Sequence, residues 1–312
     1  MTLRAAVLGT GSWARKIHLP ALAAHPQVDL VGVWGRRGDT AWAVGDEFAI
    51  PAYDDLERLL ATVDLVSVAV TPQAQPALAA AAARAGVHLV LEKPAAEDAL
   101  GCEALAAAVA STGVQSTVFL SRLWDPARRE WLDAVSAHRW RAIRYGWMSA
   151  GMRPGSPGAG DWRREAGPLI DVGPHIIGLA EYLAGPVATI RAEAPAHGRL
   201  DLRLTHADGC ETVAVVDLLA DVTCTNEDIT LSGDGRVRGY RNPEAVDFVA
   251  AYTGMLDDLL GRVRGTRATS SRGAACSLES AVTMAAVIDE ARSQLRGDRG
   301  TGGVATPTPA RT

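Results

Sequence analysis

Lysine is scarce in this chain, and the patterns typical of several other protein classes are missing. The 31 basic residues include only two lysines, Lys16 and Lys93, so arginine supplies nearly all of the positive charge. There is no long basic run, and the formal net charge is -5, which argues against a nucleic-acid partner. No apolar stretch is both long enough and free enough of charge to cross a membrane, so we expect no membrane partner.

The four cysteines form no pattern of metal ligands. None of Cys102, Cys210, Cys224 and Cys276 lies in a C-x-x-C or at another metal-ligand spacing. We therefore expect no metal site and four reduced, mostly buried thiols in a cytoplasmic protein. A buried strand is expected from residue 3, which leaves no room for a secretory signal before it.

The first third of the chain alternates short apolar runs with helical patterns. These runs predict strands over 5–8, 28–34, 63–70, 88–92 and 114–120. Helices are predicted between them, over 12–24 (kinked or split at Pro20), 39–47, 54–61, 76–85 and 96–111. Strands separated by helices of this length indicate an α/β domain with a parallel, doubly wound Rossmann-like sheet.

The pattern changes after about Ser121. Strands are predicted over 141–148, 187–194, 199–205, 212–219 and 229–232, with hairpin turns at Asp208-Gly209 and Asp234-Gly235. Helices are predicted over 126–137, 174–183, 243–263 and 277–296, and a loop over 150–160. We therefore expect a dinucleotide-binding domain over 1–121, an α+β domain with an open, mainly antiparallel sheet over 122–296, and a disordered tail over 297–312.

A glycine-rich turn follows the first predicted strand. The segment Gly9-Thr10-Gly11-Ser12-Trp13-Ala14 fits the pattern G-x-G-x-x-G/A, in which the glycines allow a tight turn and a close approach to a pyrophosphate. The N–H groups of the following helix would hold the anion. The pattern also fits a tight strand-to-helix turn of no special function, but its place on the first strand favours a nucleotide site.

The end of the second predicted strand bears on the choice of cofactor. An acid usually binds the ribose of NAD there, but this chain has Trp34-Gly35-Arg36-Arg37. Two guanidinium groups suit the 2′-phosphate of NADP, so we predict NADP over NAD. The alternative is a solvated arginine pair.

Two further clusters carry candidate chemical groups. Lys93, in Glu92-Lys93-Pro94 at the end of the fourth predicted strand, could polarise a carbonyl or orient a hydroxyl; a solvent-exposed lysine is the alternative. In Asp171-Val172-Gly173-Pro174-His175, we expect a helix from Pro174, which would keep His175 in the first turn and neutral, ready to accept a proton. Asp171, expected on the entry loop, could orient His175 or a substrate hydroxyl, or merely cap the helix. The other histidines, including His18, are interpreted as structural or exposed.

These three motifs in this order resemble the Gfo/Idh/MocA family (glucose–fructose oxidoreductase, inositol dehydrogenase, rhizopine catabolism). Thr71-Pro72 and Trp162-Arg163 add to the resemblance, which extends to about residue 296. It implies a Rossmann domain followed by an open sheet that often forms the oligomer interface, so we expect a homo-oligomer (dimer or tetramer). It also implies redox chemistry on sugars, inositols and related compounds, with Lys93, Asp171 and His175 as catalytic residues. The expected cofactor contacts are Gly9, Thr10, Gly11, Ser12, Trp13, Trp34, Arg36, Arg37, Thr71, Pro72, Glu92, Lys93, Trp162 and Arg163.

The chain departs from the family pattern at Gln73, Pro76 and Gly178, where an Asn, a His and an acid often stand. The leading hypothesis is an NADP- or NAD-dependent oxidoreductase that transfers hydride at a hydroxyl or keto carbon of a sugar, cyclitol or nucleotide sugar. A glycoside hydrolase that uses a tightly held NAD and a non-catalytic dinucleotide-binding sensor or scaffold are the alternatives.

Overall fold

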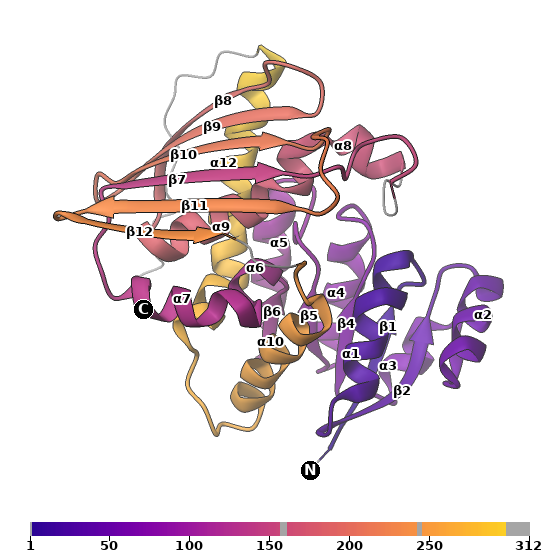
Figure 1. Ribbon diagram of the computed structural model, residues 1–312. Helices are drawn as coiled ribbons and strands as arrows, with labels where there is room; N and C mark the ends of the chain where they lie inside the picture. The colour runs from indigo at the N-terminus through magenta and orange to yellow at the C-terminus, as the bar shows by residue number, and fades with distance from the viewer. Residues whose placement is uncertain (1, 157–160, 242–244, 298–312) are drawn as a thin grey trace. The chain divides into compact units, whose positions relative to one another are not determined.

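The computed structural model describes residues 2–156, 161–241 and 245–297, and for residues 161–164 the main chain alone (Figure 1). The predicted tail therefore lies outside the described residues, apart from Gly297. Contacts divide the chain into two compact units: Met1–Trp124 with Asp247–Val282, and the described residues of Asp125–Val246 with those of Thr283–Thr312. Within the described ranges, no helix has the length and apolar character needed to cross a membrane.

The first unit is built on a six-stranded sheet in which all strands are parallel, as the sequence predicts. Its strand order is β3-β2-β1-β4-β5-β6, with the crossover between β1 and β4 typical of a doubly wound fold. The strands are β1 (Leu3–Leu8), β2 (Val28–Trp34), β3 (Ala52–Tyr53), β4 (Leu65–Val68), β5 (His88–Leu91) and β6 (Ser116–Val118). β3 was not predicted, because two residues are too few to show a pattern. The carboxyl ends of β1, β4 and β5 meet at one edge, where such folds bind ligands.

Helices connect these strands at nearly the predicted places. They are η1 (Ala14–His18), α1 (Leu19–Ala24), α2 (Gly38–Phe48), α3 (Leu56–Leu60), α4 (Gln75–Arg84), α5 (Ala99–Ala110) and α6 (Ser121–Trp124). η1 is a π-helical segment that runs directly into α1, and Pro20 lies in the first turn of α1. The expected break in this helix is therefore a change of helix type, and Pro20 lies where its missing N–H costs least.

A late segment of the chain completes the first unit. Helices α10 (Phe248–Val263) and α11 (Ser271–Ala275) belong to it, and α10 packs against η1, α1 and α6. Tyr252, Met255 and Leu259 on α10 are fully buried. Their burial removes apolar surface from water that residues 2–124 alone would leave exposed.

The second unit contains a six-stranded mixed sheet with the order β12-β11-β7-β10-β9-β8, visible in Figure 1. Its strands are β7 (Ala142–Met148), β8 (Val187–Glu193), β9 (Arg199–His206), β10 (Glu211–Asp217), β11 (Asn226–Gly233) and β12 (Arg236–Arg241). Four of the five pairings are antiparallel, as predicted, and β7 with β10 is parallel. Both predicted hairpin turns occur, with Asp234 and the glycines at 209 and 235 at positive φ.

The helices of the second unit are α7 (Pro126–Ser136), α8 (Asp161–Asp171), α9 (Gly173–Ala184) and most of α12 (Leu278–Arg296). Gly167 adopts φ 74° inside α8, so α8 consists of two helical pieces joined at a kink. One fully buried ion pair, Arg128 with Glu227 at 2.8 Å, links α7 to β11, and Tyr145 also hydrogen-bonds the Glu227 carboxylate.

Candidate functional site

The glycine turn has the geometry that a dinucleotide site requires. Gly9 has φ +134°, and a Cβ there would lie 2.2 Å from the carbonyl oxygen of Ala69, so a side chain is excluded. A Cβ on Gly11 would meet nothing within 4 Å, which leaves the approach to the turn open. The chain is helical from Ser12, and no side-chain hydrogen bond caps η1 at Trp13. The N–H groups at the start of such a helix are suited to bind a pyrophosphate.

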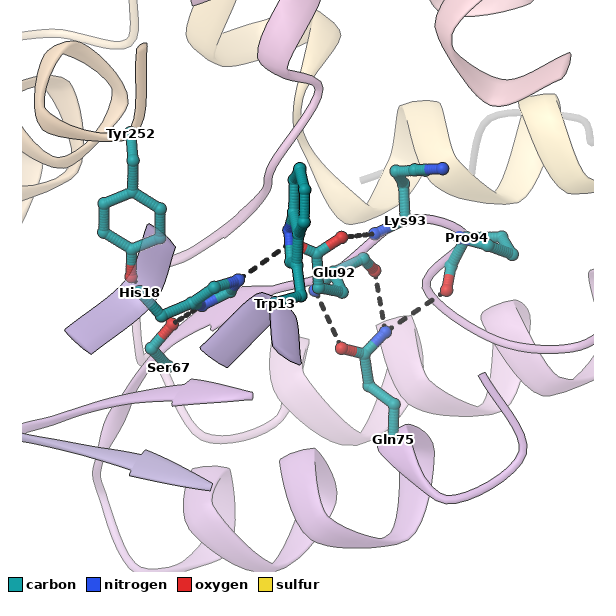
Figure 2. A network of polar contacts seen from close by, with 8 residues as sticks. All are labelled: Trp13, His18, Ser67, Gln75, Glu92, Lys93, Pro94 and Tyr252. Atoms are coloured by element: carbon teal, nitrogen blue, oxygen red, sulfur yellow. Dashed lines mark hydrogen bonds and ion pairs between the residues drawn. The ribbon is translucent and has the colours of Figure 1, made fainter. Parts of the chain in front are cut away.

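Glu92, just after β5, joins this turn to the segment that carries Lys93 (Figure 2). Its Oε1 accepts hydrogen bonds from Trp13 Nε1 at 2.8 Å and from His18 Nε2 at 2.9 Å. Its Oε2 accepts one from the backbone N–H of Lys93 at 3.2 Å. One carboxylate thus joins two segments that are 79 residues apart in the chain.

A buried chain of hydrogen bonds leads away from Glu92. Tyr252 donates to Ser67 Oγ at 2.7 Å, and Ser67 lies 2.6 Å from Nδ1 of His18. Because Tyr252 uses its proton on Ser67, the Ser67 hydroxyl donates to Nδ1, and the Nε2–H of His18 donates to Glu92. Burial raises the pKa of Tyr252, and its hydrogen bond to Ser67 offsets only part of that effect. All hydrogen bonds in the chain therefore point toward the Glu92 carboxylate.

Gln75 holds the Lys93 segment from the other side. It is fully buried at the start of α4, and its amide bonds to the backbone of residues 92, 94 and 95. Thr71 and Pro72 precede it, with Thr71 exposed and Pro72 buried, and the Thr71 carbonyl accepts the backbone N–H of Gln75 at 3.1 Å. The Lys93–Pro94 peptide bond is cis, and Lys93 itself is half-buried.

The end of β2 lies next to the glycine turn. Gly9 donates its N–H to the carbonyl of Trp34 at 2.8 Å, and a Cβ on Gly35 would lie 2.8 Å from Thr10 Cγ2. Arg37 precedes α2 as its N-cap residue; it is exposed, as is Arg36. Arg37 forms a long, solvent-exposed ion pair of 3.7 Å with Asp39. Such a pair is weak, so Arg37 stays available to an anion.

Asp171 and His175 lie in the second unit, where one of the local expectations is wrong. Asp171 is the last residue of α8 and not part of a loop, because the α8 kink at Gly167 restarts the helix at Pro168. The N-cap of α9 is Val172, which excludes Asp171 as its cap, and Pro174 lies in the first turn as expected. The His175 ring is buried and stacks on Trp147 of β7, with ring centroids 6.0 Å apart and planes at 13°.

Sequence reasoning missed the residues that support Glu92 and Lys93. His18 is buried, which agrees with its interpretation as structural, but the sequence did not show that it contacts Glu92 or that Gln75 contacts the Lys93 segment. A buried polar residue near a motif has no periodic signature, so only the tertiary contacts identify it. Trp162 and Arg163 lie outside the residues whose side chains are described.

Comparison with known proteins gives a match for the first unit. The family model described as "Oxidoreductase family, NAD-binding Rossmann fold" (GFO_IDH_MocA) matches residues 3–120. The putative oxidoreductase YceM of Salmonella typhimurium is 30% identical over 61% of this chain and 59% of its own length. The putative UDP-kanosamine synthase oxidoreductase subunit of Amycolatopsis mediterranei is 32% identical over 60% of this chain and 53% of its own. The aligned regions thus span between half and three fifths of these relatives.

The solved structures agree on the fold of the whole chain. GenD2 from gentamicin A biosynthesis, solved in complex with NAD, has a TM-score of 0.81 at 19% identity and covers 96% of this chain and 95% of its own. At that identity the likeness concerns the fold alone. The glycine turn, the strand order and the family match lead to one conclusion: residues 3–120 match the NAD-binding Rossmann domain of the Gfo/Idh/MocA oxidoreductase family.

Proposed function

We propose that this protein is an NADP- or NAD-dependent oxidoreductase that interconverts a hydroxyl and a keto group on a sugar, cyclitol or nucleotide sugar. The observation that carries the proposal is the bridge made by Glu92. Its two carboxylate oxygens hold Trp13 of the glycine turn and the backbone N–H of Lys93. A cofactor on the glycine turn would therefore be held against the same frame that holds the lysine. The name of the kanosamine relative, which mentions a UDP-sugar, supports a polyhydroxylated substrate.

Each of the three candidate residues receives a role that suits its chemistry. The ammonium of Lys93 donates a hydrogen bond to the reacting oxygen and polarises it. The imidazole of His175 takes the hydroxyl proton when the alcohol is oxidised and returns it in the reverse direction. Its stacking on Trp147 limits ring rotation and so supports directional proton exchange. Asp171 positions the substrate or His175.

The bound nicotinamide would supply the hydride acceptor or donor. Gly9, Gly11 and the start of η1 would hold its pyrophosphate. We propose NADP as the preferred form, because the exposed Arg36 and Arg37 lie at the N-terminus of α2, where a guanidinium pair and the helix N–H groups both favour a 2′-phosphate.

We also propose that the second sheet mediates homo-oligomerisation. Along β7 every second residue is buried, and the opposite face includes the exposed Met148, 41% accessible. Sedimentation of the purified protein tests this, and a monomer at micromolar concentration would reject it.

The proposed function is tested with a panel of polyols, ketosugars and nucleotide sugars. Turnover is measured from the absorbance of the reduced cofactor. Lys93→Ala should reduce kcat by roughly 100-fold or more, a typical loss for a group that assists proton transfer. Cofactor affinity should stay within about threefold in the same variant. Lys16→Ala, which changes the other lysine of the chain, is the matched control. Full activity of Lys93→Ala would reject the assignment.

A net absorbance change also separates the alternatives. A glycoside hydrolase with a tightly held NAD would release product without net reduction of the cofactor. A sensor or scaffold would bind the cofactor and turn over nothing.

A further inference from the structure

Gln75 is a fully buried amide beside the candidate site, at a place that no motif identifies. It is the first residue of α4 and has no exposed surface. A buried amide costs free energy unless its oxygen and its N–H groups are hydrogen-bonded, so its partners indicate why the residue is there.

Among the described residues, the Gln75 side-chain amide bonds to backbone groups of one short segment (Figure 2). Oε1 accepts the N–H of Glu92 at 2.8 Å. Nε2 lies 2.8 Å from the carbonyl oxygen of Glu92, 3.2 Å from that of Pro94 and 3.0 Å from that of Ala95. Two N–H groups are thus shared among three carbonyls, and the amide matches the polar groups on both sides of Lys93.

These contacts act on Lys93 without touching its side chain. Residue 92 is held from one side and residues 94 and 95 from the other, so the main chain at Lys93 is fixed between two anchors. The N–H of Lys93 itself is bound by Glu92. An apolar residue at position 75 would fill the same volume but would leave buried carbonyls and the Glu92 N–H without their partner.

We propose that Gln75 is a positioning residue that sets the placement of Lys93 for the reaction. This inference rests on the proposed role of Lys93. A side chain that reacts must be held to within a fraction of an ångström, and a displacement of about 1 Å can cost about 100-fold in rate. Removing the amide should therefore lower kcat much more than it weakens cofactor binding.

The scarcity of lysine provides a direct test. Protein labelled with ¹⁵N-lysine gives two backbone amide signals in a TROSY spectrum, from Lys93 and from the exposed Lys16 of η1, which serves as the internal reference. In a Lys16→Arg variant only the Lys93 signal remains, which assigns both signals. In Gln75→Leu, the Lys93 signal should shift or broaden while the Lys16 signal stays in place. kcat should fall roughly 10–100-fold with the cofactor Kd within about twofold.

A stability control separates positioning from general loosening. Leu59→Ala removes a fully buried apolar side chain of α3 in the same unit, and it should lower the stability without moving the Lys93 signal. If Gln75→Leu does not fold, Gln75→Asn takes its place; its amide is one methylene too short to reach all the carbonyls, and it should give an intermediate shift.

An unmoved Lys93 signal in either folded variant, or an equal shift in Leu59→Ala, overturns the proposal. If the Lys93 signal shifts in Gln75→Leu but the wild-type protein turns over no substrate, Gln75 still positions Lys93 and the proposed function is rejected instead.

Discussion

Two glutamates, the fully buried Glu227 in the second unit and the partly buried Glu92 in the first, have different roles. Glu227 has no exposed side-chain surface and pairs with the equally buried Arg128. The side chain of Glu92 remains 13% exposed, and it accepts hydrogen bonds from an indole, an imidazole and a backbone N–H. Glu227 thus joins a helix to a sheet, whereas Glu92 joins two loops at a strand edge. We expect removal of the first to affect stability and removal of the second to affect chemistry.

The largest effect should come from Glu227→Gln. Burial alone would lower the pKa of Arg128, but the attraction of Glu227, with Tyr145 and Tyr240, outweighs it and raises that pKa. The variant would therefore keep a buried charge without its counter-ion, and the free energy of unfolding should fall by about 3–5 kcal/mol. Chemical denaturation measures this. Asp228→Asn, on the same strand in an exposed ion pair with Arg241, should cost at most about 1 kcal/mol.

Glu92→Gln should instead lower the activity strongly and the stability only slightly. The amide oxygen still accepts from Trp13 or His18, but its NH₂ group would face the N–H of Lys93 and displace that loop. We expect kcat to fall about 10–100-fold. The free energy of unfolding should change by only about 1 kcal/mol, the worth of a single hydrogen bond. A Glu92→Gln protein with normal kcat and a loss of stability as large as that of Glu227→Gln would contradict the comparison.

A third carboxyl, Glu181 on α9, extends the comparison to a group that titrates near neutrality. Burial raises its pKa to about 7, partly offset by the hydrogen bond from the Val187 N–H. Because the folded pKa lies above the unfolded value, the stability that Glu181 contributes is fully present below about pH 4.5 and is lost as the pH rises through about 7. Glu181→Gln should remove this slope and stabilise the protein by about 2 kcal/mol at pH 8. Thermal unfolding at pH 5 and pH 8 measures it, with the exposed Glu193→Gln as the control; equal slopes in both variants would reject the assignment.

The smallest effect concerns exposed arginines, in contrast to the buried Arg128. Arg36→Ala combined with Arg37→Ala should weaken NADPH binding about tenfold, or about 1.4 kcal/mol, and leave NADH binding unchanged. Calorimetric titration with each cofactor measures the ratio. Arg58→Ala, an exposed arginine of α3, should change neither affinity. An unchanged ratio of NADPH affinity to NADH affinity in the double variant would contradict the proposed preference for NADP.

The fold was largely predictable because its signals are local. β1 and β5 are short apolar runs with turn residues beside them, and Asp208-Gly209 marks a hairpin on its own. β12 was not predicted as a strand, since five of its six residues are exposed and show no alternation. The parallel pairing of β7 with β10 depends on which strands meet across 69 residues, and no local pattern specifies that.

The candidate site was predictable only in its motifs. The glycine turn and Lys93 are visible in the sequence because glycine and lysine are unusual choices where they occur. Gln75 and His18 are ordinary residues whose meaning comes from what they contact. Their partners lie 17 and 74 residues away, so only the folded chain reveals them.

The return of α10 to the first unit also bears on the order of events during synthesis. The chain leaves that unit at Trp124 and re-enters it at Asp247. Tyr252 bonds Ser67, Phe248 packs on Trp13, and Asp257 meets His25, each at least 185 residues after its partner. A ribosome adding about 5–20 residues per second needs several more seconds after Trp124 before these partners emerge. The Rossmann unit is thus begun before the second unit but cannot be completed until the entire main sheet of the second unit has been made.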